Sequence, residues 1–260
     1  MPRRSRPASA VRSSAARRVS GPGSGRRSRP FSRVRPDPAS RPSPALRAGP
    51  GGRASPRRQP RGGPWETAAA GLARAHGIAL VFGWAERDGA DVWNAATALG
   101  PEGTVLAHYR KIQLFGEMER ASFRAGEDLP PVFELGGRRF GLLICYDIEF
   151  PEHARGLARR GAQAILVPTA NPSGYEHVQR LLVPARACEN GVFVAYANYC
   201  GTDQGLRFGG GSVIAGPDGA ALASSGTAPA LLIADLPELS AYPGEMLSAQ
   251  LADLRLPGGD

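Results

Sequence analysis

The first 64 residues limit the fold of this chain more than any other feature of its sequence. They contain 12 of the 24 prolines, and residues 1–63 contain 17 arginines, no lysine and a single acidic residue, Asp37. Large apolar residues are few there and follow neither a helical nor a strand period. Such a segment cannot bury enough apolar surface to offset the entropy lost on ordering. We therefore predict that residues 1–64 are disordered and that residues 65–260 hold the fold.

The charge of the chain is divided at the same place. Residues 1–63 carry a formal charge of +16, whereas the remaining 197 residues carry 15 basic and 22 acidic residues, or −7. The basic isoelectric point therefore belongs to the leading segment, and the body gives no reason to expect a nucleic-acid partner. The segment itself has three interpretations: a solvated basic tail, a targeting peptide, or translation from a wrong start or frame. A tail that binds nucleic acid electrostatically is a further hypothesis.

Beyond residue 65 the pattern alternates between helical and strand-like runs, which is typical of a layered α/β fold. Helices are predicted over Glu66–His76, closed by Gly77, and near His153–Arg160 and Glu176–Cys188. Strands are predicted over Ile78–Trp84, Val92–Leu99, Thr104–Tyr109, two runs flanking Gly136-Gly137 of which the second is Phe140–Cys145, Ala164–Val167 and Val192–Ala197. A hairpin around Pro217-Asp218-Gly219 and the apolar run Leu231–Ala234 are expected to complete the core.

Cysteine and lysine usage narrows the class of protein. The three cysteines, Cys145, Cys188 and Cys200, form no CxxC or Cys/His cluster, which argues against a disulfide framework or a zinc site and favours a reducing cytoplasm. No apolar run approaches the roughly 20 residues of a membrane span. Of the 32 basic residues only Lys111 is lysine. That bias suggests that Lys111 does something arginine cannot, such as presenting a compact ammonium on a flexible stem.

Cys145 stands where a reactive cysteine is expected. It ends a buried strand and precedes a tight turn into a helix, so its sulfur can be exposed at the sheet rim near a helix N-terminus, which stabilises a thiolate. An isolated cysteine in an apolar strand is more often a small buried hydrophobe. Its context reverses that balance, because the run from Gly141 to Glu152 reads GLLICYDIEFPE.

This run resembles the nucleophile motif of the nitrilase superfamily, in which a strand ends in Cys-Tyr/Trp-Asp and leads to Phe-Pro-Glu. Three more segments resemble the family in the same order. They are the lysine motif YRKIQLF at 109–115, with its lysine 34 residues before the cysteine, RACENGVF at 186–193, and the late hairpin from FGGGS at 208–212 through PDG at 217–219. The resemblance covers roughly residues 66–237.

The resemblance implies a four-layer α-β-β-α sandwich that hydrolyses nonpeptide C–N bonds through a Cys-Glu-Lys triad, without a metal or other cofactor. Cys145 would be the nucleophile and Lys111 its partner, and Glu119 matches a second glutamate that supports the lysine and the substrate. Tyr146, Glu149 and Asn171 are the substrate-binding residues that the resemblance implies. The partner would be a small-molecule amide or related C–N substrate, and the family's habit of association implies a possible homo-oligomer.

The sequence departs from the family at the general base. The family's base is a glutamate in a Pro-Glu context, near the end of an early strand, whereas residues 1–64 contain no glutamate and Glu66 follows no apolar strand. About 60 residues of core would be lost with it, leaving unpaired strand edges and exposed apolar faces. Glu119, Glu149 and Glu117 are the candidate substitutes. Gln113 also replaces the usual histidine after the lysine.

Two functions are compatible with these residues. The first is an amidase-like carbon-nitrogen hydrolase of incomplete N-terminal structure, with activity reduced or lost for want of its base. The second is a catalytically inactive pseudoenzyme that keeps a pocket for a small amide or carboxylate. The substrate cannot be read from the sequence: aliphatic amides, ureido acids, nitriles and acyl donors all remain open.

Overall fold

The computed structural model describes residues 58–203 and 205–255. Residues 1–57, most of the segment predicted to be disordered, therefore lie outside the described residues. The first sheet and its helix are formed by β1 (Arg58–Gln59), α1 (Pro64–His76), β2 (Leu80–Asp88), β3 (Asp91–Leu99) and β4 (Val105–Arg110). The second sheet is formed by β5 (Val132–Leu135), β6 (Arg138–Leu142), β7 (Ala164–Thr169), β8 (Phe193–Asn198), β11 (Val213–Ala215) and β12 (Ala221–Ser224). The other elements are α2 (Gly116–Ser122), the 3₁₀ turn η1 (Cys145–Glu149), α3 (Pro151–Arg159), the π-helical segment η2 (Val178–Leu182), α4 (Val183–Asn190), the hairpin β9 (Cys200–Asp203) with β10 (Leu206–Gly209), the 3₁₀ turns η3 (Leu239–Ala241) and η4 (Gly244–Met246), and α5 (Gln250–Asp253).

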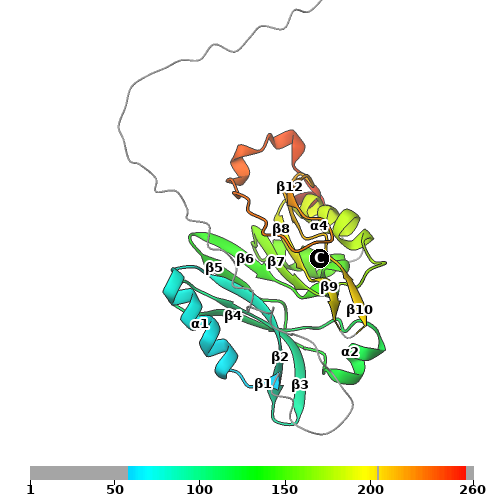
Figure 1. The fold of residues 1–260 in the computed structure, drawn as a ribbon. Coiled ribbons are helices and arrows are strands. Elements are labelled where there is room, and N and C mark those ends of the chain that lie inside the picture. Colours follow the sequence, from blue (N-terminus) through cyan, green and yellow to red (C-terminus); the bar gives the residue numbers. More distant parts are fainter. Residues whose placement is uncertain (1–57, 204, 256–260) are drawn as a thin grey trace, which may run out of the picture. The chain divides into compact units, whose positions relative to one another are not determined.

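The first sheet has the strand order β1-β2-β3-β4 (Figure 1). Strands β2, β3 and β4 are antiparallel neighbours, and the short β1 runs parallel to β2. The β2–β3 hairpin turns at Gly89, whose φ of 59° suits a residue without a Cβ. Strand β4 ends directly before Lys111, so this sheet delivers the lysine to the site.

The second sheet has the strand order β12-β11-β8-β7-β6-β5. Its central strands β6, β7 and β8 are parallel, with α3 connecting the first two and η2 with α4 connecting the next two. Because the carboxyl ends of parallel strands meet at one edge of a sheet, the residues that follow these three strands gather there. Cys145 follows β6 and Asn171 follows β7, so both lie at that edge.

Three apolar clusters hold the elements together. One joins the two sheets, and its buried members are Ala96, Ala98, Ala107, Tyr109, Phe133, Leu142 and Ile144. A second packs α3 and α4 on the other face of the second sheet, through Leu157, Ala158, Val183 and Ala187. The third packs α1 on the first sheet through Ala70, Ala73 and Leu99. Burial of these side chains stabilises the fold by about 25 cal/mol per Å² of apolar surface. This packing holds the ends of the strands that carry the site in fixed relative positions.

A polar network lies on the face of the first sheet that carries Trp84. Glu86, only 1% exposed, accepts hydrogen bonds from His108 Nε2 at 2.8 Å and from Arg110 Nη2 at 2.6 Å. Burial raises the pKa of Glu86, but the bonds from His108 and Arg110 outweigh it, so that the pKa falls to about 2.

Most predicted helices and strands occur in the predicted order, but β1, which lies in the segment predicted to be disordered, α2 and the β9–β10 hairpin were not predicted. Three of the predicted elements also differ from the structure. The strand predicted over Phe140–Cys145 stops pairing at Leu142, because the chain turns into η1 at Cys145. The single helix predicted over Glu176–Cys188 is wrong in its first half: π-helical turns precede α4. Pro184 lies at the junction and has no N–H to continue a regular helical ladder.

The prediction that Leu231–Ala234 completes the core is wrong, and this is the third difference. Leu231 is 85% exposed and Ile233 80% exposed, and the segment pairs with no described strand. An apolar run becomes a buried strand only where a neighbouring strand and an apolar face receive it, and composition alone does not supply either. Leu72 on α1 and Val105 on β4 are also exposed.

Candidate functional site

Cys145 begins a strained turn at the edge of the second sheet. Its φ of 47° is the only positive value at a non-glycine residue among those that the structure describes. Residues with a Cβ rarely adopt this conformation, which costs on the order of 1 kcal/mol or more. The turn lifts the chain out of the sheet directly after Leu143, whose N–H still donates to the Leu166 carbonyl at 3.1 Å. The strain is therefore concentrated at the residue predicted to be the nucleophile.

The surroundings of the Cys145 sulfur act on its pKa in opposite directions. Part of the residue is reached by solvent, yet the protein packed around it raises the pKa of the thiol, and this is the largest effect. The positive charge of Lys111 lowers the pKa, as do the backbone N–H groups of Ala170 and Tyr146, while Glu119 raises it. The balance stays above the usual value, so the resting thiol keeps its proton at neutral pH. Attack by sulfur therefore needs a proton acceptor.

Lys111 is fully buried and held by one carboxylate. Its Nζ donates to Glu119 Oε2 at 2.7 Å, and the same oxygen accepts the Phe115 N–H at 2.6 Å. The other oxygen of Glu119 accepts from Asn94 Nδ2 at 2.9 Å. Short bonds between ionised groups in a buried place are strong and directional. This arrangement fixes the Lys111 ammonium close enough to Cys145 for its charge to act on the thiol.

Asp147 connects the turn of Cys145 to the segment of Lys111. It is completely buried, and burial raises its pKa although three donors and the charge of Lys111 oppose this. Its Oδ1 accepts the Gln113 N–H at 2.9 Å, and its Oδ2 accepts Tyr109 Oη at 3.0 Å and the Ile144 N–H at 3.1 Å. The two parts of the site thus share a carboxylate.

Glu149, the last residue of η1, carries a half-buried side chain near the site. Burial raises its pKa, and the charges of His177, Lys111 and Arg186 lower it less than burial raises it. Among the described residues its carboxylate has no hydrogen-bond partner. Arg186 instead binds the backbone, donating to the Ile148 carbonyl at 3.1 Å and to the Glu149 carbonyl at 2.9 Å, and so ties α4 to η1.

Aromatic side chains from three segments meet beside η1. Tyr146 packs edge-on against Phe115, with 5.1 Å between ring centroids, and against Phe150 at 5.0 Å. Phe115 also packs against Tyr175 at 5.3 Å. Such edge-to-face contacts add to the stability gained from burial. They give the surroundings of Tyr146 an apolar character next to the polar groups of Lys111 and Glu119.

Asn171 is buried behind the carboxyl end of β7. Its Nδ2 donates to the Tyr175 carbonyl at 3.0 Å and to Gln179 Oε1 at 3.3 Å, while its N–H donates to Asn198 Oδ1 at 2.7 Å. These bonds hold the loop after β7, which also carries the Ala170 N–H. The substrate contacts predicted for Asn171, Tyr146 and Glu149 stay predictions.

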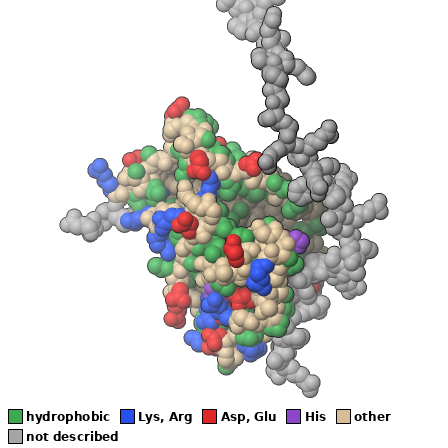
Figure 2. Space-filling view, turned by 90° about the vertical axis from the view of Figure 1, so that its left-hand side faces the viewer, with side chains coloured by type: hydrophobic (Ala, Val, Ile, Leu, Met, Phe, Trp, Pro, Cys, Tyr) green, Lys and Arg blue, Asp and Glu red, His purple; other side chains and the backbone are tan. Residues whose placement is uncertain are grey.

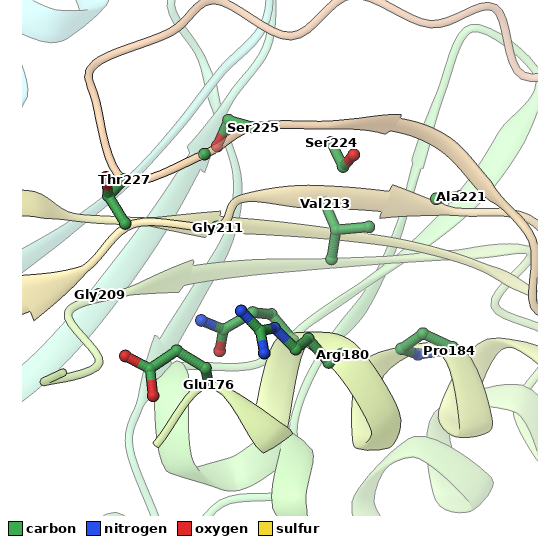
Figure 3. Close-up of a pocket in the computed structure, with 12 residues that line it drawn as sticks. Glu176, Arg180, Pro184, Gly209, Gly211, Val213, Ala221, Ser224, Ser225 and Thr227 are labelled. Atoms are coloured by element: carbon green, nitrogen blue, oxygen red, sulfur yellow. The ribbon is translucent and has the colours of Figure 1, made fainter. Parts of the chain in front are cut away.

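A cavity of about 470 Å³ lies between the helical segment η2–α4 and strands β11 and β12 (Figure 3). Arg180 extends from the helical side toward the strands, and Gln179 links this wall to Asn171. Neither Cys145 nor Lys111 lines the cavity, so it is separate from the cysteine site. Its lining residues are Glu176, Gln179, Arg180, Pro184, Gly209, Gly211, Val213, Ala221, Ser224, Ser225, Gly226 and Thr227.

Within residues 58–203 and 205–255, no group of three or more His, Cys, Asp or Glu side chains is arranged to hold a metal ion. None of the helices in this part of the chain is long and apolar enough to cross a membrane. On the face drawn in Figure 2, arginine side chains are interspersed with aspartate and glutamate.

The family model for carbon-nitrogen hydrolases matches residues 54–242. The chain belongs to this family. It is a carbon-nitrogen hydrolase domain of the nitrilase superfamily, with amidases among its relatives and a cysteine nucleophile as the family's reactive group. The resemblance inferred from the sequence motifs is confirmed.

The relatives of this carbon-nitrogen hydrolase include a hydrolase encoded in the pqqF 5′ region of Pseudomonas protegens, 45% identical over 74% of this chain and 68% of the relative. An (R)-stereoselective amidase of a Pseudomonas species is 40% identical over 59% of this chain but only 55% of its own length. A crystal structure of an amidase from Nesterenkonia sp. superposes with a TM-score of 0.67 and 45% identity, covering 73% of this chain and 69% of that one. A mutant of the Nesterenkonia enzyme shows acrylamide added at the active-site cysteine.

The structure brings most predicted site residues of this hydrolase together: Cys145, Lys111, Glu119, Tyr146 and Glu149 lie around the carboxyl edge of β6. Sequence reasoning missed Asn94, Tyr109 and the Ala170 N–H. Asn94 lies within β3, and its partner Glu119 is 25 residues away in the chain, so no local sequence pattern predicts this hydrogen bond. Tyr109 and Asp147 lie inside the recognised motifs, but only the structure shows that they bond to each other.

Proposed function

We propose that this chain is an amidase-like hydrolase of nonpeptide C–N bonds, built as a four-layer α-β-β-α sandwich with Cys145 as the nucleophile. The observation that carries the proposal is the position of Lys111, the only lysine of the chain, which is fully buried, bonded to Glu119, and acts on the Cys145 thiol. A buried ammonium beside a strained, partly accessible cysteine lowers the stability of the fold. Such unfavourable arrangements gather at functional sites, which supports a catalytic role for this pair. Small amides are the proposed substrates, since a mutant of the Nesterenkonia amidase was solved with butyramide.

The proposed reaction has two steps. The Cys145 sulfur loses its proton and attacks the amide carbonyl, and the resulting oxyanion is stabilised by the Lys111 ammonium and the Tyr146 N–H. Collapse of this intermediate breaks the C–N bond, releases the amine with the proton, and leaves a thioester on Cys145. Water then attacks the thioester, releases the carboxylic acid and returns the proton to sulfur.

We propose further that this chain turns over slowly, because its general base is absent. The Glu119 carboxylate already accepts hydrogen bonds from Lys111, Phe115 and Asn94, which makes it a poor proton acceptor for Cys145. Residues 1–64 contain no glutamate. The raised pKa of the Cys145 thiol should lower the rate further, because few molecules carry a thiolate at neutral pH. Loss of a general base typically costs on the order of 10²–10⁴ in rate.

A catalytically inactive binding protein is the second candidate, and the same raised thiol pKa favours it. Its site would still bind a small amide through the Lys111 region without breaking the C–N bond. Saturable binding of butyramide without ammonia release would support this candidate over the first.

The test measures ammonia release from butyramide and acrylamide by the purified chain and two variants. Cys145→Ala should abolish turnover, whereas Cys188→Ala, a matched change at another partly buried cysteine, should preserve it. Denaturing mass spectrometry should trap the acyl group as a mass increase on the peptide that contains Cys145. Turnover that survives Cys145→Ala would refute the enzymatic proposal.

A further inference from the structure

We propose that Asp147 is the positioning residue that holds Lys111 against Cys145. The inference rests on the proposed function and names a residue that acts through two others. Asp147 has no exposed surface, so its carboxylate cannot be there for solvation. A buried carboxylate persists where its hydrogen bonds and nearby charges compensate the loss of water.

On one side, Asp147 closes the turn that carries the nucleophile. Its backbone N–H donates to the Ile144 carbonyl at 3.0 Å, and its side chain accepts the Ile144 N–H at 3.1 Å. These reciprocal bonds enclose Cys145 at its positive φ of 47°. That conformation is unfavourable for a residue with a Cβ, so the surrounding hydrogen bonds must offset the strain and hold the backbone in place.

On the other side, the same carboxylate anchors the segment that carries the lysine. It accepts the Gln113 N–H and Tyr109 Oη, which lie on either side of Lys111 in the chain. Tyr109 Oη in turn accepts the Ile112 N–H at 3.3 Å. The strand-to-loop junction from 109 to 113 is therefore attached to Asp147 at both ends.

This link crosses between the two sheets. Tyr109 lies near the end of β4 in the first sheet, whereas Ile144 follows β6 of the second. Apolar packing between sheets tolerates shifts of a fraction of an ångström, because it is not directional. Hydrogen bonds at about 3 Å to one carboxylate tolerate such shifts less well, because they depend on distance and angle. Asp147 therefore sets the position of the ammonium relative to the sulfur more tightly than packing does.

The side chain must be a carboxylate for this purpose. All three groups that bond to it are donors, and an ionised aspartate only accepts. An asparagine side chain at this position would present one NH₂ group toward a backbone N–H whichever way its amide turned. Asp147→Asn therefore removes at least one of the bonds while it keeps the size of the side chain.

The experiment is a double-mutant cycle between Asp147→Asn and Lys111→Met, read by alkylation of Cys145. Iodoacetamide labelling of the full chain is followed by mass spectrometry across a pH series, with Cys188 and Cys200 as internal controls. In the otherwise unchanged chain, Lys111→Met should move the Cys145 labelling profile to higher pH, because the ammonium lowers the thiol pKa. In the Asp147→Asn background the same change should move the profile by less than about half as much.

An equal shift in both backgrounds would overturn the inference, since a purely structural carboxylate would leave the coupling unchanged. Asp128→Asn removes an exposed aspartate and is the matched control, which should leave the full shift. If Asp147→Asn does not fold, Tyr109→Phe removes one of the three donors and should still reduce the coupling. Where turnover is measurable, Asp147→Asn should lower kcat by about 10²-fold, the cost of a misplacement near 1 Å.

These readouts separate the two proposals. Absence of ammonia release from the unchanged chain would count against the proposed function alone, because alkylation needs no turnover. An unreduced coupling would count against the role of Asp147 alone.

Discussion

Replacement of Glu119 by alanine should destabilise the protein far more than the loss of an ordinary ion pair. Glu119 accepts the Lys111 ammonium at 2.7 Å, the Phe115 N–H at 2.6 Å and Asn94 Nδ2 at 2.9 Å. Glu119→Ala leaves the ammonium of Lys111 in a place where the residue has no exposed surface. The free energy of unfolding should be lowered mainly because the buried Lys111 ammonium is left unpaired, and less by the loss of the hydrogen bonds themselves.

The magnitude follows from burial. Removal of one partner from a buried pair costs about 3–5 kcal/mol. For a urea dependence of about 3 kcal/mol per M, this lowers the midpoint of unfolding by more than about 1 M. Glu119→Gln should have a smaller effect, because its carbonyl can still accept from Lys111 and Phe115 while Asn94 turns its amide. Its midpoint should lie between those of the unchanged chain and of Glu119→Ala.

The assay is urea denaturation at about pH 7, followed by circular dichroism and by tryptophan fluorescence. The control is Asp88→Ala, which removes the 2.8 Å pair of Asp88 with Arg110 at a side chain that is 65% exposed. Exposed pairs contribute about 0–1 kcal/mol. If Glu119→Ala shifted the midpoint no more than Asp88→Ala, the reasoning about a stranded ammonium would be refuted.

Two further predictions concern acid stability and packing. Because the pKa of Glu86 is lowered from 4.5 to about 2, its ionisation stabilises the fold fully above pH 4.5 and this contribution is lost as the pH falls toward 2. The stability advantage over Glu86→Gln should therefore shrink by about 2 kcal/mol between about pH 6 and pH 3 in urea titrations, and a constant advantage would contradict the prediction. Gly141→Ala would place a Cβ 2.8 Å from the Leu157 side chain, whereas a Cβ at Gly156 on the adjoining helix meets nothing within 4 Å. Thermal unfolding should show a loss of about 1–3 kcal/mol for Gly141→Ala and a gain of up to about 1 kcal/mol for Gly156→Ala, and equal effects would show that β6 and α3 are not tightly packed.

Local pattern is sufficient to predict most helices and strands. The helix ending at His76 is placed by its period and by Gly77, which has a φ of 60° as its C-cap. The parallel strands β7 and β8 are recognisable as short apolar runs between helices. In each case the signal lies within a few residues, because helical capping and strand burial act over that range.

The two wrong predictions have different physical reasons. The side chains of Leu231–Ala234 favour a core strand, yet Leu231 is exposed, since strand formation depends on a neighbour that the run itself does not encode. The π-helical turns of η2 escape prediction because the proline at their junction with α4 is also typical of an ordinary helix start.

The sequence by itself determined which two residues we propose as the reactive pair. The family-like motifs around both residues, together with the lone lysine of an arginine-rich chain, single out Cys145 and Lys111 as candidates. Only the tertiary structure decided how they meet. Lys111 follows a strand of one sheet and Cys145 a strand of the other, so their relation depends on the packing of the two sheets and on the donors that converge on Asp147. Hydrogen bonds between residues far apart in the chain leave no periodic signal, because each partner satisfies only its local pattern until the fold brings the two together.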